Sequence, residues 1–358
     1  MNMICWSVQQ LEAFLERLAE ESWDVIGPVI RDGAMVYDEM RALPVGVGDE
    51  QEAGRYRLTD RNDQSRFGYN LGPATWKQFL FPPAETLFTV RDDVIASSLP
   101  EPRKMAFVGV RACELAAIKV QDRVFLGGEH EDAHYRQRRN NILIVAVDCA
   151  QAAPTCFCTA NDDGPSVGGG ADVVLTEINP QDPEYLVRFV SDRAESLIAG
   201  IGGSEVTPAQ REQAKAAVQQ TAAQITRQLP REGLREDLFA ALGHPHWDDI
   251  AGRCLGCGNC TQVCPTCFCS TTAEVYDLES GDVSHDRVWD SCFTEMHSYT
   301  HGGSIHRETR TRYRQWLTHK LASWEDQFDM SGCTGCGRCI SWCPVGIDLT
   351  LETRLLIE

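Results

Sequence analysis

Two cysteine motifs constrain the fold of this chain more than any other feature. One runs from Cys254 to Pro265 and the other from Cys333 to Pro344, and both have the spacing C-x2-C-x2-C-x3-C-P. Bacterial-type ferredoxins hold [4Fe–4S] clusters with this spacing. Thiolates two residues apart can wrap one cube, and the glycines between them let the backbone approach its sulfides. The motif pair therefore predicts two [4Fe–4S] clusters and an electron-transfer role.

The ligands of each cluster are predicted to come from both motifs. In two-cluster proteins of this kind, the fourth cysteine of each motif binds the other cluster. Cluster one is then held by Cys254, Cys257, Cys260 and Cys343. Cluster two is held by Cys333, Cys336, Cys339 and Cys264. Structural zinc is the alternative, and it is disfavoured because zinc sites usually combine separated C-x2-C pairs or Cys/His mixtures.

Half of the 16 cysteines lie outside these motifs. The pentapeptide Pro-Thr-Cys-Phe-Cys occurs twice, at 154–158 and 265–269, and Cys149 ends an apolar run. Buried or free thiols that pack as small hydrophobes are one interpretation. The repeated pair favours another, a third cluster with ligands drawn from Cys113, Cys156, Cys158, Cys267, Cys269 and Cys292. Surface or core positions are favoured over ligation for His297, His301 and His306.

The residues before about 245 predict an α+β or α/β domain. Apolar residues in Gln9–Glu20 recur at the spacing of one helical face, and helices are also expected over 113–125 and 207–228. Short apolar runs at 105–110, 141–147 and 172–178 predict buried strands. Residues 162–170 are a loop by composition. We expect domains at 1–245 and 246–358, the second with a long insert between its motifs that is helical over 309–327.

Composition and absent motifs narrow the function. The net charge of −19 disfavours nucleic-acid binding, which depends on Lys and Arg. No apolar run is long enough for a membrane span, and no secretory signal is visible, so a cytoplasmic location is expected. No G-x-G-x-x-G follows a strand and no P-loop occurs, so no flavin or nicotinamide site is recognised in this chain.

The order of these motifs carries a family resemblance over about residues 71–347. The segments that carry it are 109–115, 135–139, Cys149, the two Cys-Phe-Cys pairs, 289–292 and the 335–344 motif. This order resembles the iron–sulfur β subunit of cytoplasmic NADP-linked [NiFe] hydrogenases, the sulfhydrogenases. The A subunit of anaerobic sulfite reductase has a similar layout. The long insert between the motifs likewise resembles the helical ferredoxin module of respiratory electron carriers.

The resemblance implies a non-catalytic relay subunit within a hetero-oligomer. Its partners would be a flavin subunit that handles NAD(P)H and the [NiFe] hydrogenase subunits. The equivalent subunit of a sulfite reductase is the nearest alternative, since the relay chemistry is the same. A further alternative is a self-contained iron–sulfur enzyme with an active site at Cys113 in the N-terminal domain, which predicts turnover by the isolated chain.

Overall fold

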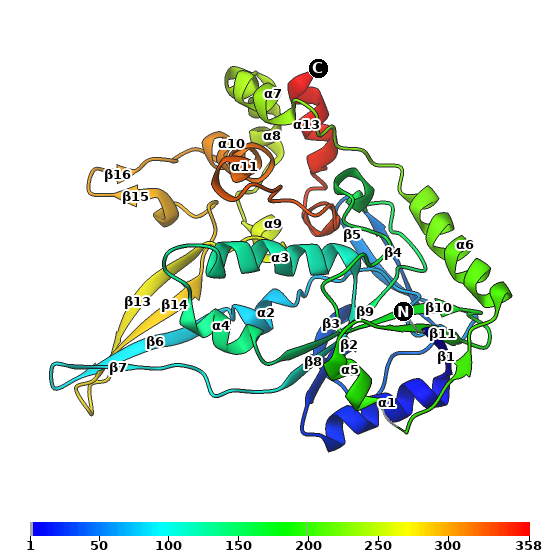
Figure 1. Ribbon diagram of the computed structural model, residues 1–358. Helices are drawn as coiled ribbons and strands as arrows, with labels where there is room; N and C mark the ends of the chain where they lie inside the picture. The colour runs from blue at the N-terminus through cyan, green and yellow to red at the C-terminus, as the bar shows by residue number, and fades with distance from the viewer. Residues whose placement is uncertain (1–2, 199) are drawn as a thin grey trace.

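A mixed eight-stranded sheet organises the N-terminal part of the computed structural model, which describes residues 3–198 and 200–358 (Figure 1). The strand order is β12-β1-β11-β10-β9-β8-β2-β3. The bounds are β1 (Met3–Ser7), β2 (Asp24–Arg31), β3 (Ala34–Glu39), β8 (Met105–Val110), β9 (Ile142–Val147), β10 (Val173–Ile178), β11 (Glu184–Phe189) and β12 (Ser204–Glu205). Strands β10, β9, β8 and β2 are parallel, and the other pairs are antiparallel.

The three strands predicted from apolar runs form the centre of this sheet. Every residue of β8, β9 and β10 is buried, which confirms the prediction. Their side chains alternate between two apolar clusters, so that Phe107 and Ile144 face one side while Val108 and Val145 face the other. A parallel sheet that is buried on both faces needs a layer of helices on each side.

Helices cover both faces of the sheet. Helices α1 (Val8–Glu20) and α5 (Asp192–Leu197) pack on one face, with the predicted α1 stripe of Leu11, Phe14, Leu15 and Leu18 buried. The other face carries α2 (Lys77–Leu80), α3 (Ala112–Leu126) and α4 (Ala133–Arg139), as Figure 1 shows. Helix α6 (Pro208–Gln224) packs on β10 and β11 and ends before the predicted Gln228. Residues 162–170 contain no helix or strand, as expected.

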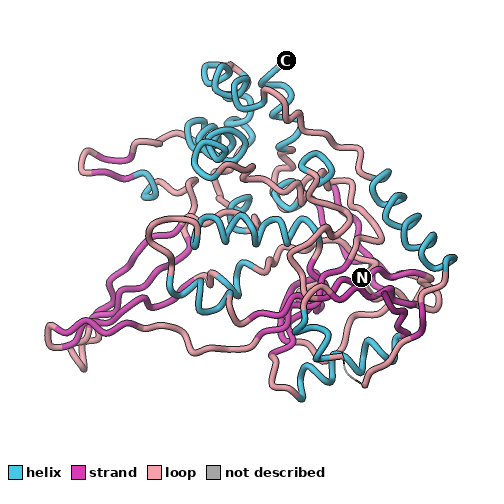
Figure 2. Tube along the Cα trace, viewed as in Figure 1, coloured by secondary structure: helices cyan, strands magenta, loops and turns pink. Residues whose placement is uncertain are grey.

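Two smaller sheets were not expected from the sequence. One is the antiparallel sheet β13-β14-β6-β7, which extends away from the body in Figures 1 and 2. It joins β6 (Ala84–Arg91) and β7 (Val94–Ser97) to β13 (Ser270–Tyr276) and β14 (Val283–Trp289), from the insert between the motifs. The other is the hairpin β4 (Val47–Glu52) and β5 (Arg55–Asp60). One sheet therefore contains strands from both sides of the predicted domain boundary at 245.

The cysteine motifs lie among short helices, drawn in cyan at the top of Figure 2. They are α7 (Leu234–Ala240), η2 (Ala241–Gly243), α8 (His246–Arg253), α9 (Asn259–Gln262), η3 (Met296–Ser298), α10 (Thr309–Thr318), the π-helical η4 (His319–Ser323), α11 (Trp324–Phe328), α12 (Arg338–Ser341) and α13 (Leu349–Ile357). Strands β15 (Tyr299–Thr300) and β16 (Gly303–Ser304) form a small hairpin. The expected helix over 309–327 is present as α10, η4 and α11. Among the described residues, no helix is long and apolar enough to cross a membrane.

Candidate iron–sulfur centres

The four cysteines predicted for cluster one surround a single cavity. It is lined by Cys254, Cys257, Cys260 and Cys343, together with Cys339 and aromatic side chains of the module core. Gly256 and Gly258 adopt left-handed backbone angles, with φ of 63° and 72°, and so turn the chain around the cavity. The Gly256 amide donates to Cys254 Sγ at 3.4 Å, and the Ile347 amide donates to Cys343 Sγ at 3.3 Å.

This cavity fits a cluster that accepts hydrogen bonds. Trp316 lines it, and the indole Nε1 is buried without a partner among the described residues. An unpaired buried donor is costly, so a sulfur acceptor at this place would stabilise the structure. Burial raises the pKa of the Cys260 thiol well above its usual value, and the neighbouring Cys254 and Cys343 thiols raise it further. Metal binding at these positions must therefore displace protons.

The cysteines predicted for cluster two also lie near one another. Cys264 lies close enough to the first three thiols of the second motif, Cys333, Cys336 and Cys339, for its charge to raise their pKa values, and we call such a pair charge neighbours. A buried Lys320 donates from Nζ to Cys264 Sγ at 3.5 Å and to Thr266 Oγ1 at 2.9 Å. Burial raises the pKa of Cys333 to about 12, against the lowering effect of Lys320. A fourth cysteine from the first motif thus joins the second group.

The second motif faces the N-terminal part of the chain. Arg338, within that motif, forms an ion pair of 2.6 Å with Glu114 of α3, and both side chains are almost fully buried. Glu114 also accepts hydrogen bonds from Tyr37 Oη at 2.9 Å and Trp76 Nε1 at 3.0 Å. The Phe157 amide donates to the Gly335 carbonyl at 2.9 Å. The first Cys-Phe-Cys pair therefore packs directly on this motif.

A separate group of cysteines forms at the ends of two central strands. Its members are Cys113, Cys149, Cys156 and Cys158, and Cys149 is a charge neighbour of each of the other three. Strands β8 and β9 are adjacent and parallel, so the residues that follow them meet at one edge of the sheet. Cys336 of the second motif is also a neighbour of Cys113, Cys156 and Cys158. The sequence prediction of a third cluster did not include Cys149. Its position directly after a predicted strand is the feature of the sequence that could have indicated it.

A buried arginine lies beside this group. Arg111 donates to the Phe67 and Tyr69 carbonyls at 2.9 and 3.0 Å, and Cys149 is its main charge neighbour. Among the described carboxylates, none lies within ion-pair distance of the Arg111 guanidinium. A buried cation needs a compensating charge. Four thiolates on an iron–sulfur cluster are of the right sign, so the group fits such a cofactor.

The remaining cysteines have different neighbours. Cys269 and Cys292 share a hydrogen bond between their sulfurs, which lowers the pKa of Cys269 to about 6 and raises that of Cys292. Cys267 bonds in the same way to Cys264. The two copies of Pro-Thr-Cys-Phe-Cys thus lie in different groups. His297 is a charge neighbour of Cys269, and its side chain is 32% exposed.

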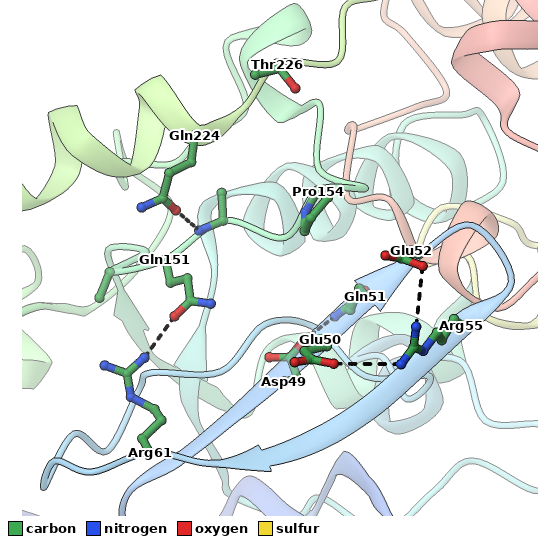
Figure 3. A pocket seen from close by; sticks show the side chains of 12 residues that line it. Asp49, Glu50, Gln51, Glu52, Arg55, Arg61, Gln151, Pro154, Gln224 and Thr226 are labelled. Atoms are coloured by element: carbon green, nitrogen blue, oxygen red, sulfur yellow. Dashed lines mark hydrogen bonds and ion pairs between the residues drawn. The ribbon is translucent and has the colours of Figure 1, made fainter.

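An open groove of about 690 Å³ borders the N-terminal group. Figure 3 shows its floor on β4 and β5, with Asp49 and Arg55 labelled, and a wall formed by residues 150–154. Arg61 Nη1 donates to Gln151 Oε1 at 2.8 Å across one end. This wall is the segment between Cys149 and Cys156, so the groove brings solvent close to the N-terminal group of cysteines.

The cavity, the paired motifs and their neighbours define an iron–sulfur protein. Residues 253–347 match the family described as a 4Fe-4S dicluster domain, which implies two [4Fe–4S] clusters. Over 318 residues the chain is 29% identical to the Sulfhydrogenase 2 subunit beta of Pyrococcus furiosus, covering 87% of this chain and 92% of that protein. No solved structure matches the chain. The resemblance drawn from the motifs is therefore confirmed: along most of its length the chain is similar to a sulfhydrogenase β subunit, and it contains a 4Fe-4S dicluster domain.

Proposed function

We propose that the chain relays electrons between a flavin subunit that uses NAD(P)H and a [NiFe] hydrogenase subunit, within a cytoplasmic hetero-oligomer. The dicluster match and the similarity along most of a sulfhydrogenase β subunit support this role. Bound [4Fe–4S] clusters would supply one-electron carriers. The chain itself holds the clusters, excludes water from them and fixes their order.

The main support for this proposal is a crossed ligand set, in which the fourth cysteine of each motif binds the cluster of the other motif. Cluster one is held by Cys254, Cys257, Cys260 and Cys343, and cluster two by Cys333, Cys336, Cys339 and Cys264. The shared cavity of the first four supports that assignment, and the position of Cys264 beside the second motif supports the other. Cys260 is in turn a charge neighbour of Cys264. A crossed set holds the two clusters close, as electron transfer requires.

A third cluster extends this path into the N-terminal part. Its proposed ligands are Cys113, Cys149, Cys156 and Cys158, with Arg111 offsetting their charge. Cys336 lies next to this group and binds cluster two, so the order of centres is the third cluster, cluster two and cluster one. Replacing Cys113 by Ser should remove about four irons per chain. Cys5→Ser, at a buried cysteine outside these groups, is the matched control and should remove none.

The partners decide between this role and its nearest alternative. The similarity to a sulfhydrogenase β chain favours hydrogenase over the equivalent subunit of an anaerobic sulfite reductase. The full chain, tagged and purified anaerobically with whatever subunits accompany it, should carry nickel with it. Copurification of sirohaem instead would select the sulfite reductase. Both results are read by metal analysis and optical spectroscopy of the intact complex.

The self-contained enzyme makes the opposite prediction for the isolated chain. The Cys113 side chain is 5% exposed, which opposes the access that a substrate would need to a nucleophile at this position. We therefore expect the isolated, cluster-loaded chain to accept electrons from a chemical reductant but not from hydrogen or NADPH. Turnover of either substrate by the isolated chain would overturn the relay.

A further inference from the structure

Three cysteines outside the relay gather where the four-stranded sheet joins the cysteine module. Strands β13 and β14 pair with Ser270 opposite Trp289, and the Asp290 amide donates to the Cys269 carbonyl at 2.9 Å. The end of this ladder therefore places Cys269 beside the segment that leads to Cys292, and their sulfurs share a hydrogen bond. Cys267, two residues before Cys269, completes the group.

A buried lysine faces the same group. Lys77 is 5% exposed, and its Nζ donates to the Cys267 carbonyl at 3.2 Å and lies 3.8 Å from the centre of the Trp289 ring. Its charge neighbours of opposite sign are the sulfurs of Cys267, Cys264 and Cys269. No carboxylate in the described part of the chain lies within ion-pair distance of Lys77.

A buried ammonium without a counter-charge is strongly destabilising. Three thiolates around an iron–sulfur core leave a net negative charge, which the Lys77 ammonium would offset. Lys77 is therefore a buried cation beside this group of cysteines, just as Arg111 is a buried cation beside the N-terminal group. The burial of Lys77 beside these sulfurs is a second observation that favours a negatively charged centre at this place.

His297, whose side chain is 32% exposed, is the candidate for a fourth ligand. His297 is a charge neighbour of Cys269, and its Nδ1 lies 3.3 Å from Asp290 Oδ2. A carboxylate on one ring nitrogen orients a histidine and leaves the other nitrogen free to bind a metal. Cys264 touches Cys267 but is already assigned to cluster two, so His297 is the better candidate.

We propose that Cys267, Cys269, Cys292 and His297 hold a fourth metal centre of the iron–sulfur class. The inference rests on the proposed function in one respect, that the chain carries iron–sulfur clusters at all. Cys260 of cluster one is a charge neighbour of Cys292, and Cys264 of cluster two bonds to Cys267. The fourth centre thus lies beside both clusters, on the side of the extended sheet. Electrons could then leave clusters one and two along a second path, toward the extended sheet, in addition to the path toward the N-terminal part.

Metal content of the full chain tests the cysteines. Iron, acid-labile sulfide and zinc are measured in anaerobically purified wild type and in the double variant Cys269→Ser/Cys292→Ser. The variant should lose about four irons and the matching sulfide, while Cys5→Ser should lose none. Unchanged iron in the double variant would overturn the proposal, and so would loss of zinc in place of iron. The EPR signals of clusters one and two, if retained, show that the variant is folded.

The histidine has its own test. His297→Ala is compared with His301→Ala, an exposed histidine of the same segment. Pulsed EPR of the reduced wild type should show a nitrogen coupling from a directly bound imidazole, lost in His297→Ala and kept in His301→Ala. If the double cysteine variant does not fold, this pair decides the proposal, and a coupling unaffected by His297→Ala overturns it. Wild-type iron near zero would instead overturn the proposed function itself.

Discussion

The two cysteine motifs have the same spacing but opposite surroundings. In the first, Cys257 is exposed and Leu255 is 65% exposed, and Val345 beside them is 40% exposed. In the second, Thr334 and Arg338 are 3% and 1% exposed. The spacing determines which metal centre each motif binds, whereas the residues between the cysteines determine what each centre faces. With the proposed ligands, cluster one would face outward, and cluster two would face the N-terminal sheet.

This difference would give the proposed relay an outward end and an inward end. The inward cluster adjoins the N-terminal cysteine group through Cys336, and the outward cluster presents apolar residues to the surface. Val345 follows the second motif, yet it lies by the first cavity because Cys343 crosses over. We therefore expect a partner subunit to dock over cluster one. Four predictions test this contrast, in order of decreasing effect.

Removal of iron should unfold the helical module before the N-terminal sheet. Cys254, Cys260 and Cys343 pack against the aromatic core of the helical module, whereas the sheet around β8 and β9 has its own core. Structural metal sites contribute on the order of 10 kcal/mol to folding. After chelation of the reduced protein, hydrogen exchange should show lost protection in α8 and α10 and retained protection in β8 and β9. Unchanged protection of α8 in iron-free protein would contradict this account.

Loss of the buried arginine should destabilise the inward motif strongly. Arg338→Met leaves Glu114 buried without its ion-pair partner, at a cost of about 3–5 kcal/mol. Arg253, before the first motif, pairs with the buried Glu352 at 2.9 Å, but its own side chain is 44% exposed and Glu352 keeps His246 as a partner at 2.7 Å. Arg253→Met should therefore cost less, about 0–1 kcal/mol. Urea unfolding of the cluster-loaded variants measures both. Equal costs would show that the motifs are not differently buried.

Equivalent glycines should differ in their tolerance of a methyl group. Gly335 and Gly256 occupy the same motif position, with φ of 65° and 63°, so each Ala variant pays about 1–2 kcal/mol for the left-handed conformation. A Cβ on Gly335 would lie 2.5 Å from the Phe157 backbone, whereas the nearest atom to one on Gly256 is 3.8 Å away. Gly335→Ala should therefore cost about 1–3 kcal/mol more. Thermal unfolding compares the two, and equal melting temperatures would contradict close packing of Gly335.

The smallest effect on stability is expected at the outward surface. Leu255→Ser removes an exposed side chain and should change the free energy of unfolding by less than about 0.5 kcal/mol. It should weaken binding of the partner about tenfold, or about 1.4 kcal/mol, in a titration with the purified partner subunit. Leu278→Ser, 96% exposed at the far end of the extended sheet, is the control. If only Leu278→Ser weakens binding, the partner docks on that sheet instead.

Regular local patterns made much of the fold predictable. The apolar stripe of α1 has the helical period, and β8, β9 and β10 are continuous apolar runs, as strands buried on both faces require. Their positions were therefore confirmed within one or two residues. Strand β13 has no such signal, because six of its seven residues are exposed and its sheet pairs segments almost 200 residues apart. Pairing at that distance depends on the whole fold.

The cysteines of the candidate site likewise fall into those that local spacing predicts and those that only the fold brings together. Cys254 to Cys264 and Cys333 to Cys343 are recognisable because a cluster requires their local spacing. The division of the other cysteines depends on strand ends, since β8 and β9 bring Cys113 to Cys149 while the β13–β14 ladder brings Cys269 to Cys292. The buried cations Arg111 and Lys77 mark these groups, but their burial is visible only in the folded chain.

The most direct test of the relay is the iron and acid-labile sulfide content of the anaerobically purified full chain, with EPR of the reduced state. The account predicts at least about eight irons with equal sulfide, from two four-iron clusters, and spin coupling between the reduced pair. A content near four irons, or zinc without sulfide, would contradict the crossed set of eight cysteines.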